Sequence, residues 1–478
     1  MPPRKRFVLF ASIFLYCLTP SPASQPQIDD ATRRLSHDIF RQLVEINSTD
    51  SQGSVTAASE AMAQRFRDAG FAESSIQILG PSDRKKNLVV RLRGTGKYRP
   101  VLLMGHLDVV EARPEDWTTD PFTFVEKDGF YYGRGTQDMK SGDAIMVTTL
   151  IRFEKEGYTP DRDIILALTA DEEGGRSNGV DWLLKNHRDL IDAEFVFNHD
   201  GGGIVADHGK PIMMAVNAIE KLYADFHLSV TNPGGHSSLP RPDNAIYSLA
   251  DALERLQHYQ FPFELNEVTR ASYERLAGVE TAQRAADMKA ILRNPPDRAA
   301  IVRLSRDPID NSTTHTTCVA TRLSAGHANN ALPQRAEANV NCRILPGHSA
   351  EEVRSILIKV LADPKITVQY VDDFGDLHDR APDRKSFPPP PLPRDVFLPL
   401  EKITAEMWPG TPVIPIMSTG ASDSFYTMGA GLPTYVIAGI AIDRNDVRAH
   451  GRDERLGIES YYKGVDFYYR YLKAVTSE

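Results

Sequence analysis

From residue 86 to residue 197, short apolar runs alternate with segments whose apolar residues have helical spacing. This alternation limits the possible folds more than any other feature. Short apolar runs of this kind are typical of buried strands. Strands that alternate with helices predict an α/β sheet whose functional loops lie at the strand ends. The predicted strands lie at 86–92, 100–104, 163–168 and 193–197, and the predicted helices at 141–156 and 179–186.

A different pattern begins near residue 221. The segment 222–230 alternates apolar and polar positions, which is typical of a half-buried strand. Strands with one polar face and helices on the other side predict a small α+β domain. Its further predicted elements are a helix at 242–257, a polar helical stretch at 265–300, a hairpin of 316–323 and 335–344, and a helix at 350–361.

These patterns predict two domains. The first would comprise residues 29–220 and 376–478, and the second, residues 221–375, would be inserted into it. A chain of 478 residues, 41% of them hydrophobic, is long enough for two cores. The net charge of −9 argues against a nucleic-acid-binding protein.

The N-terminus is typical of a signal peptide. Three basic residues at 4–6 precede an apolar segment at 7–18 that is too short to span a membrane, and small residues at 21–23 offer a cleavage site. We therefore expect residues 1–24 to be removed and the protein to be exported, either to a periplasm or out of the cell. The alternatives are an uncleaved N-terminal anchor and lipid attachment at Cys17.

Export makes two cysteines and two asparagines relevant. Cys318 and Cys342 remain after cleavage, and they could form a disulfide or stay as buried thiols. The sequence contains no CxxC pair, which excludes a cysteine-rich metal site. Asn47 and Asn311 each begin an Asn-Ser-Thr sequon, which is modified only if the secreting cell glycosylates proteins.

Residue types that bind metals follow several of the apolar runs. "ADEEGG" places three acids, Asp171 to Glu173, at the exit of a buried strand, where they repel one another unless solvent or cations neutralise them. Each candidate has an ordinary alternative, such as a core histidine, a helix cap, a turn residue or a solvated loop. Together, imidazoles and carboxylates at strand ends form the nitrogen and oxygen set that zinc prefers. The further candidates are His106, Asp108, Asp138, Asp200 and His450.

The stretches "GHLDVV", "GRGTQDMKSG", "ADEEGG" and "AHGRDE" resemble, in this order, the motifs of the M20 family of two-zinc metallopeptidases. The stretches "AIEKLYADFHLSVTNPGGHSS" and "STGASDSFY" look closest to its carboxypeptidase S-like, N-acyl-amino-acid-hydrolysing branch, near the dipeptidases and aminoacylases. The resemblance implies a zinc-peptidase-like α/β catalytic domain, with a mixed sheet flanked by helices, and an inserted α+β lid that also serves dimerisation.

The resemblance also implies a role for each candidate. Asp138 would bridge two zinc ions, although Co²⁺ or Mn²⁺ could replace zinc. His106 and Asp200 would complete one site, and Glu173 and His450 would complete the other. Asp108 would orient His106. Glu172 would be the general base that takes a proton from the attacking water.

The inserted domain and the C-terminal region supply further candidates. In the family, the histidine that matches His236 of "NPGGHSS" reaches the partner subunit's site and polarises the substrate carbonyl, although a turn histidine has the same sequence appearance. Arg343 would grip a substrate carboxylate with its planar guanidinium. Asn330 and Gly420 would also contact the substrate.

The sequence therefore predicts an exported, zinc-dependent hydrolase that releases a C-terminal amino acid from a short peptide or an N-acyl amino acid, by attack of a water molecule that the metals activate. One alternative is an aminoacylase-like amidohydrolase without peptidase activity, and another is a non-catalytic binding protein on the same fold. We expect no nucleic acid, no membrane span after signal cleavage, and a homodimer formed through the lid.

Overall fold

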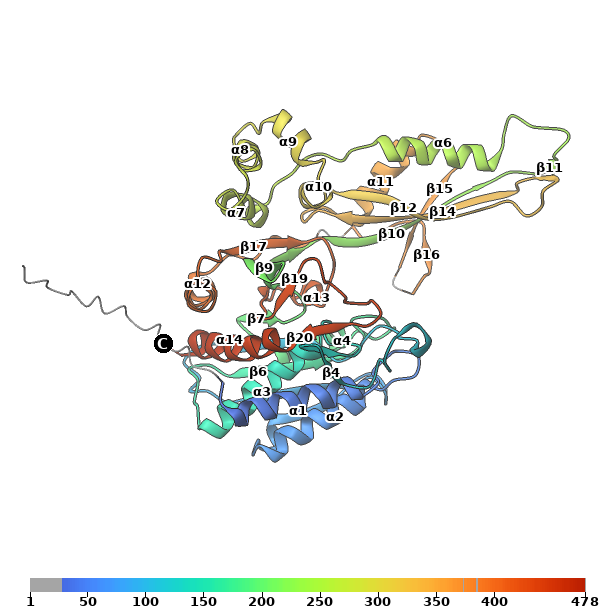
Figure 1. Ribbon diagram of the computed structural model, residues 1–478. Helices are drawn as coiled ribbons and strands as arrows, with labels where there is room; N and C mark the ends of the chain where they lie inside the picture. Colours follow the sequence, from blue (N-terminus) through green and yellow to red (C-terminus); the bar gives the residue numbers. More distant parts are fainter. Residues whose placement is uncertain (1–27, 373, 384–385, 478) are drawn as a thin grey trace, which may run out of the picture.

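The computed structural model describes residues 28–372, 374–383 and 386–477. The predicted signal peptide lies outside this range. The chain forms a broad helix-covered domain, from which a second domain extends to one side (Figure 1). This arrangement confirms the predicted fold class. None of the described helices is both long and apolar enough to cross a membrane.

The first domain is built on a ten-stranded mixed sheet. Its order is β1-β2-β6-β3-β7-β18-β9-β8-β19, with β17 paired to β9 outside this path. The three central neighbours β6, β3 and β7 are parallel, so their C-terminal ends meet at one edge. The strands are β1 (Ile76–Leu79), β2 (Asn87–Leu92), β3 (Val101–His106), β6 (Ile164–Thr169), β7 (Phe195–Asn198), β8 (Gly203–Asp207), β9 (Lys210–Glu220), β17 (Val413–Ser418), β18 (Thr434–Val436) and β19 (Ala441–Asp443).

Helices cover both faces of this sheet because the central strands are apolar on both sides. In β3, Leu103 packs into the core beneath α1, α3 and α14, whereas Leu102 and Met104 pack on the opposite side with α4. A three-stranded sheet of β4 (Val125–Lys127), β5 (Phe130–Tyr132) and β20 (Arg455–Gly457) lies beside it. The helices are α1 (Asp30–Glu45), α2 (Val55–Asp68), α3 (Lys140–Glu156), α4 (Gly179–Asn186), α5 (Arg188–Ile191), α12 (Arg394–Met407), α13 (Ser424–Gly429) and α14 (Ile458–Thr476).

The second domain contains a five-stranded sheet in the order β12-β14-β10-β15-β16. One face is buried under α6 and α11, and alternate residues of β14 are therefore buried. Its strands are β10 (Leu222–Thr231), β12 (Thr317–Ala325), β14 (Arg335–Ile344), β15 (Thr367–Val371) and β16 (Leu377–His378), with the small pair β11 (Gly235–His236) and β13 (Ala331–Leu332). The covering helices are α6 (Ala245–His258) and α11 (Ala350–Leu361). We call this domain the lid, and we propose that it begins at residue 221, where the chain changes sheets.

The predicted polar helical stretch forms a separate cluster of four helices with its own small core. Its first helix packs on β17 of the catalytic sheet, where the Arg275 guanidinium donates to the carbonyl of Val413 at 2.6 Å. This packing covers the free edge of β17, which would otherwise expose unpaired backbone groups. The four helices are α7 (Glu267–Leu276), α8 (Ala282–Ile291), α9 (Arg298–Leu304) and α10 (Pro308–Thr314).

The two cysteines left open by the sequence form a disulfide. Cys318 on the edge strand β12 lies directly opposite Cys342 on β14, and the bond joins these two neighbouring strands.

Candidate metal centre

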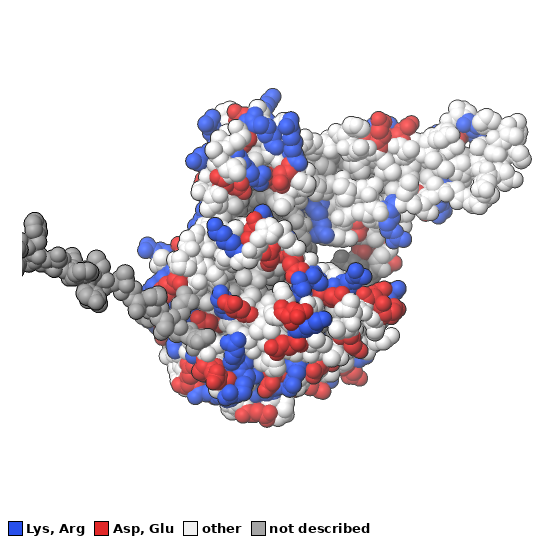
Figure 2. All heavy atoms as spheres, viewed as in Figure 1, with Lys and Arg blue, Asp and Glu red and all other residues white. Residues whose placement is uncertain are grey.

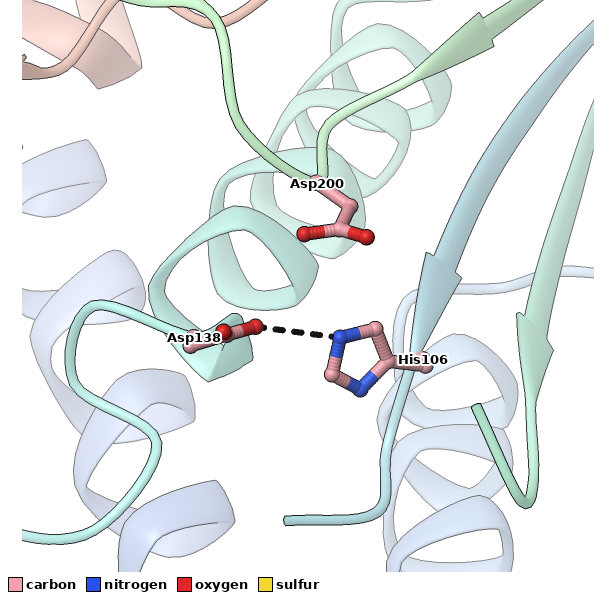
Figure 3. A group of neighbouring side chains, drawn as sticks. All are labelled: His106, Asp138 and Asp200. Carbon is pink, nitrogen blue, oxygen red and sulfur yellow. Dashed lines mark hydrogen bonds and ion pairs between the residues drawn. The ribbon is translucent and has the colours of Figure 1, made fainter. Parts of the chain in front are cut away.

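The predicted ligands converge at one edge of the large sheet. His106 is the last residue of β3, Glu173 follows β6 and Asp200 follows β7. Asp138 precedes α3, and His450 lies in the loop before β20. Figure 3 shows the side chains of His106, Asp138 and Asp200 directed toward one another. The C-terminal edge of parallel strands is where α/β proteins bind ligands.

The carboxylate of Asp138 lies between two imidazoles. Its Oδ1 is 3.1 Å from Nε2 of His106, and its Oδ2 is 3.1 Å from Nε2 of His450. The same Nε2 of His450 is 2.8 Å from Oε1 of Glu173. Two ligand groups therefore share one carboxylate, and within each group the ligand atoms lie within 4.8 Å of one another. The groups are His106, Asp138 and Asp200, and Asp138, Glu173 and His450.

The ring of His106 is oriented by Asp108. Nδ1 of His106 donates to the backbone carbonyl of Asp108 at 3.0 Å, which leaves the Nε2 lone pair directed at the centre. The Asp108 carboxylate is farther from this nitrogen, at 3.8 Å. It accepts instead from the backbone N–H groups of Glu172 and Glu173, at 3.2 and 3.0 Å. One residue thus positions the imidazole through its carbonyl and both glutamates through its side chain.

The centre concentrates negative charge. Glu172 lies with His106 and Glu173 in a third group of the same size. Burial, together with the carboxylates of Asp200 and Asp423, raises the pKa of Glu172 to about 10, and burial also raises the pKa of Asp200. Burial opposes the ionisation of Asp138 as well, but hydrogen bonds to both histidines lower its pKa. Divalent cations would relieve this repulsion, and the donor set of two imidazoles and several carboxylates fits zinc.

Sequence reasoning missed Glu454, which holds the loop before Asp138. Glu454 is fully buried and accepts a hydrogen bond from Nη1 of Arg134 at 2.7 Å. It also accepts from the backbone N–H groups of Gly135 (3.2 Å), Gln137 (2.7 Å) and Asp138 (3.1 Å). Its only signal in the sequence is its place four residues after His450, inside the same motif.

The first acid of the "ADEEGG" stretch has a structural position. Asp171 adopts a left-handed backbone conformation, with φ of 59°, and its carboxylate forms an ion pair with Lys85. Gly175 is also left-handed, with φ of 124°, and a side chain there would overlap the Asp171 carboxyl group. Asp171 and Gly175 therefore shape the loop that presents Glu172 and Glu173.

The lid candidates are divided between two places. His236 in β11 and Asn330, next to β13, lie together, because Ser237 N–H donates to the Asn330 carbonyl at 3.1 Å. Figure 1 shows β11 at the outer end of the lid, away from the catalytic domain. Arg343 lies near the base of the lid, with its guanidinium 4.6 Å from the ring centre of Tyr223. Gly420 lies in the loop after β17.

An α/β domain with clustered nitrogen and oxygen ligands at its strand ends, and a second domain inserted, defines a metallohydrolase. The family model of Peptidase family M20/M25/M40 matches residues 102–474, and the chain belongs to this family. It is an M20-type peptidase or amidohydrolase.

Similar proteins point to two branches of this family. The N-fatty-acyl-amino acid synthase/hydrolase PM20D1 of Homo sapiens is 29% identical over 392 residues, which cover 78% of this chain and 74% of that protein. A probable carboxypeptidase S-like protein of Dictyostelium discoideum is 28% identical, over 81% of this chain and 74% of that protein. An M20 family metallo-carboxypeptidase from Sulfolobus solfataricus has a similar fold, with a TM-score of 0.68 and 17% identity, covering 94% and 100% of the two chains.

Proposed function

We propose that this chain is an exported, zinc-dependent hydrolase that cleaves the amide bond of N-acyl amino acids or short peptides and releases a C-terminal amino acid. The observation that carries the proposal is the carboxylate of Asp138 between the imidazoles of His106 and His450, with the Glu172 carboxylate beside them. One shared carboxylate can hold two cations close together. Two neighbouring cations suit the hydrolysis of an amide bond.

Different groups of residues would serve different steps of the reaction. Zinc ions in the two ligand groups would acidify water and polarise the substrate carbonyl. Bound cations would favour the ionised form of Glu172, because positive charge nearby lowers the pKa of a carboxyl group. The ionised Glu172 would take the proton of the attacking water and deliver it to the leaving amine nitrogen. Asp108 would keep Glu172 in place, because its carboxylate accepts from the Glu172 backbone N–H.

The position of Arg343 supports recognition of a free carboxylate. The guanidinium lies on the open, polar face of the lid sheet and stacks over Tyr223. Among the residues that the structure describes, no carboxylate forms an ion pair with Arg343. The N–H groups of its guanidinium are therefore available to a substrate carboxylate. A guanidinium binds a carboxylate in bidentate geometry. A C-terminal amino acid, whether acylated or at the end of a peptide, provides this group.

The exposed edge of the lid supports a homodimer in which His236 of one subunit serves the metal centre of the other. β12 has one neighbouring strand, and its side chains Val319 and Leu323 are 57% and 68% exposed. Figure 2 shows few charged side chains over the outer part of the lid, compared with the catalytic domain. β12 also carries the exposed Arg322. Exposed apolar side chains with few charges around them are typical of interface cores.

A substrate panel tests the proposal. The mature chain, loaded with zinc and with its metal content measured, would be incubated with dipeptides and with N-acyl amino acids of short and long acyl chains. We expect release of the C-terminal amino acid, loss of activity after chelation, and recovery with Zn²⁺. Hydrolysis of N-acyl amino acids alone would favour the aminoacylase-like alternative, which the name of the human relative also suggests. No hydrolysis of any substrate by protein with two bound zinc ions would contradict the proposal.

A further inference from the structure

One buried acidic residue and one buried basic residue connect the catalytic domain to the lid. β9 of the catalytic sheet ends at Glu220, β10 of the lid begins at Leu222, and Lys221 alone lies between them. The exposed fractions of Glu220 and Lys221 are 7% and 1%. Burying a charged group is costly unless fixed partners compensate it. These partners show what each side chain holds.

Lys221 holds the lid side of the junction. Its Nζ donates to the carbonyl of Ser312 at 2.9 Å and to the carbonyl of His315 at 2.8 Å, and Thr317 Oγ1 lies at 3.4 Å. These oxygens belong to the end of α10 and the start of β12. Within the described part of the chain, no carboxylate pairs with Lys221. The ammonium is therefore held by neutral oxygens of one short segment, residues 312–317, which runs from the last helix of the helical cluster into the lid strand β12.

Glu220 holds the catalytic side. Its carboxylate accepts from the backbone N–H of Ser422 at 2.9 Å and from the Ser422 hydroxyl at 2.5 Å. The backbone N–H of Lys221 donates to the carbonyl of Ser418 at 3.1 Å, on the same loop. This loop, residues 418–424, contains Gly420. We call it the pocket loop.

The pocket loop is also tied to both ligand-bearing segments of the metal centre. The Asn198 amide donates to Ser424 Oγ at 3.0 Å, while its Oδ1 accepts from the backbone N–H of Asp200 at 3.0 Å. Asp423 accepts from Nδ2 of Asn178 at 2.5 Å, and the same Nδ2 lies 3.2 Å from the carbonyl oxygen of Asp171, just before Glu172. A displacement of the pocket loop would therefore shift both the segment that carries Asp200 and the segment that carries Glu172.

We propose that Glu220 and Lys221 form a hinge clamp: two positioning residues that make the orientation of the lid and the geometry of the pocket loop depend on each other. Successive side chains on an extended backbone point to opposite sides, so Lys221 reaches the lid while Glu220 reaches the catalytic domain. This inference rests on the proposed function.

The clamp sets the position of Arg343 relative to Gly420. Tyr223, two residues beyond Lys221, lies opposite Arg343 in the pairing of β10 with β14. A rotation of the lid about the junction would therefore change the distance between Arg343 and the pocket loop. The clamp thus keeps a substrate carboxylate at a fixed distance from the metal centre, and its loss should weaken substrate binding more than proton transfer.

The experiment compares Lys221→Met with Lys289→Met, which changes an exposed lysine on α8. Spin labels on cysteines introduced at the exposed positions Glu60 and Ile358 report the distance between the two domains without requiring activity. We expect Lys221→Met to broaden the distance distribution and to raise KM at least tenfold, with kcat changed less than threefold and zinc content unchanged. Lys289→Met should match the wild type in all four measurements.

Ser422→Ala is the second variant, because it removes one hydroxyl and should not prevent folding. It should also raise KM and broaden the distance distribution, although less than Lys221→Met. A merely structural junction would lower stability but leave the KM and the distances of the folded molecules unchanged. The proposal is overturned if folded Lys221→Met, or Ser422→Ala where the first variant does not fold, keeps the wild-type distance distribution and KM. The distance measurement remains informative even if the proposed substrates are not hydrolysed.

Discussion

Replacing Glu454 by glutamine should destabilise the protein and loosen the metal centre together. The Glu454 carboxylate accepts from Arg134 and from three backbone N–H groups of the loop that ends at Asp138. Glutamine has the same size, but its single acceptor oxygen cannot serve both sides of this arrangement. Its amide N–H group would face backbone donors, and Arg134 would lose its counter-charge in the interior.

The magnitude follows from the burial of both partners. The side chains of Arg134 and Glu454 are 4% and 0% exposed. Breaking a buried ion pair by removing one charge costs about 3–5 kcal/mol. Burial raises the pKa of Glu454 despite the opposing effect of Arg134, so desolvation outweighs the gain from pairing. We therefore expect the lower value, about 3 kcal/mol, which is roughly a 150-fold change in the unfolding equilibrium constant.

Urea unfolding of the metal-free protein at pH 7, followed by far-ultraviolet circular dichroism, measures this loss. The matched control is Glu459→Gln, since Glu459 is 84% exposed and pairs with Lys463 at 3.0 Å on the surface of α14. An exposed pair of this kind contributes less than about 1 kcal/mol. Competition with a chelator should show weaker zinc binding by Glu454→Gln. A loss of stability below 1 kcal/mol together with wild-type zinc affinity would refute the reasoning.

Three further predictions concern the reaction. Glu172→Gln should keep both zinc ions and lose about 10²–10⁴-fold in turnover, because Glu172 transfers protons; metal analysis of an inactive variant that showed no zinc would contradict this role. Asp138→Ala should lose metal from both ligand groups at once, and full activity in this variant would exclude a shared carboxylate. Mixing inactive His236→Ala with inactive Glu172→Ala should partly restore activity if His236 acts across a dimer. If activity does not return after verified subunit exchange, His236 either acts within its own subunit or has no role in the reaction.

The catalytic sheet was predictable because its strands carry a local signal. β3, β6 and β7 are short apolar runs with ligand-type residues at their ends, and parallel pairing then brings those ends together. His106, Glu173 and Asp200 could be found in this way. The lid sheet was predictable from the alternation in β10 and β14, which reflects one buried face and one open face.

The supporting contacts could not be predicted, because they join residues far apart in the sequence. Glu454 meets Asp138 across 316 positions, and Asn178 meets Asp423 across 245. An acid in a charged motif gives no sign that it will be fully buried. The packing of α7 on β17 could not be predicted from the sequence either, since helical spacing shows that a face is apolar but not which surface covers it.

Because Cys318 and Cys342 form a disulfide, the redox conditions under which this protein is produced determine its covalent structure. The bond closes a loop over 24 residues, for which chain entropy predicts about 3–4 kcal/mol of stabilisation. The catalytic domain contains no part of this bond, so protein produced in a reducing cytosol would have the same metal ligands in place. Without this bond, however, the lid strand β12 would be held only by hydrogen bonds and packing, and it would fray more readily. Two batches of equal purity, made under different redox conditions, should therefore differ in self-association while agreeing in zinc content.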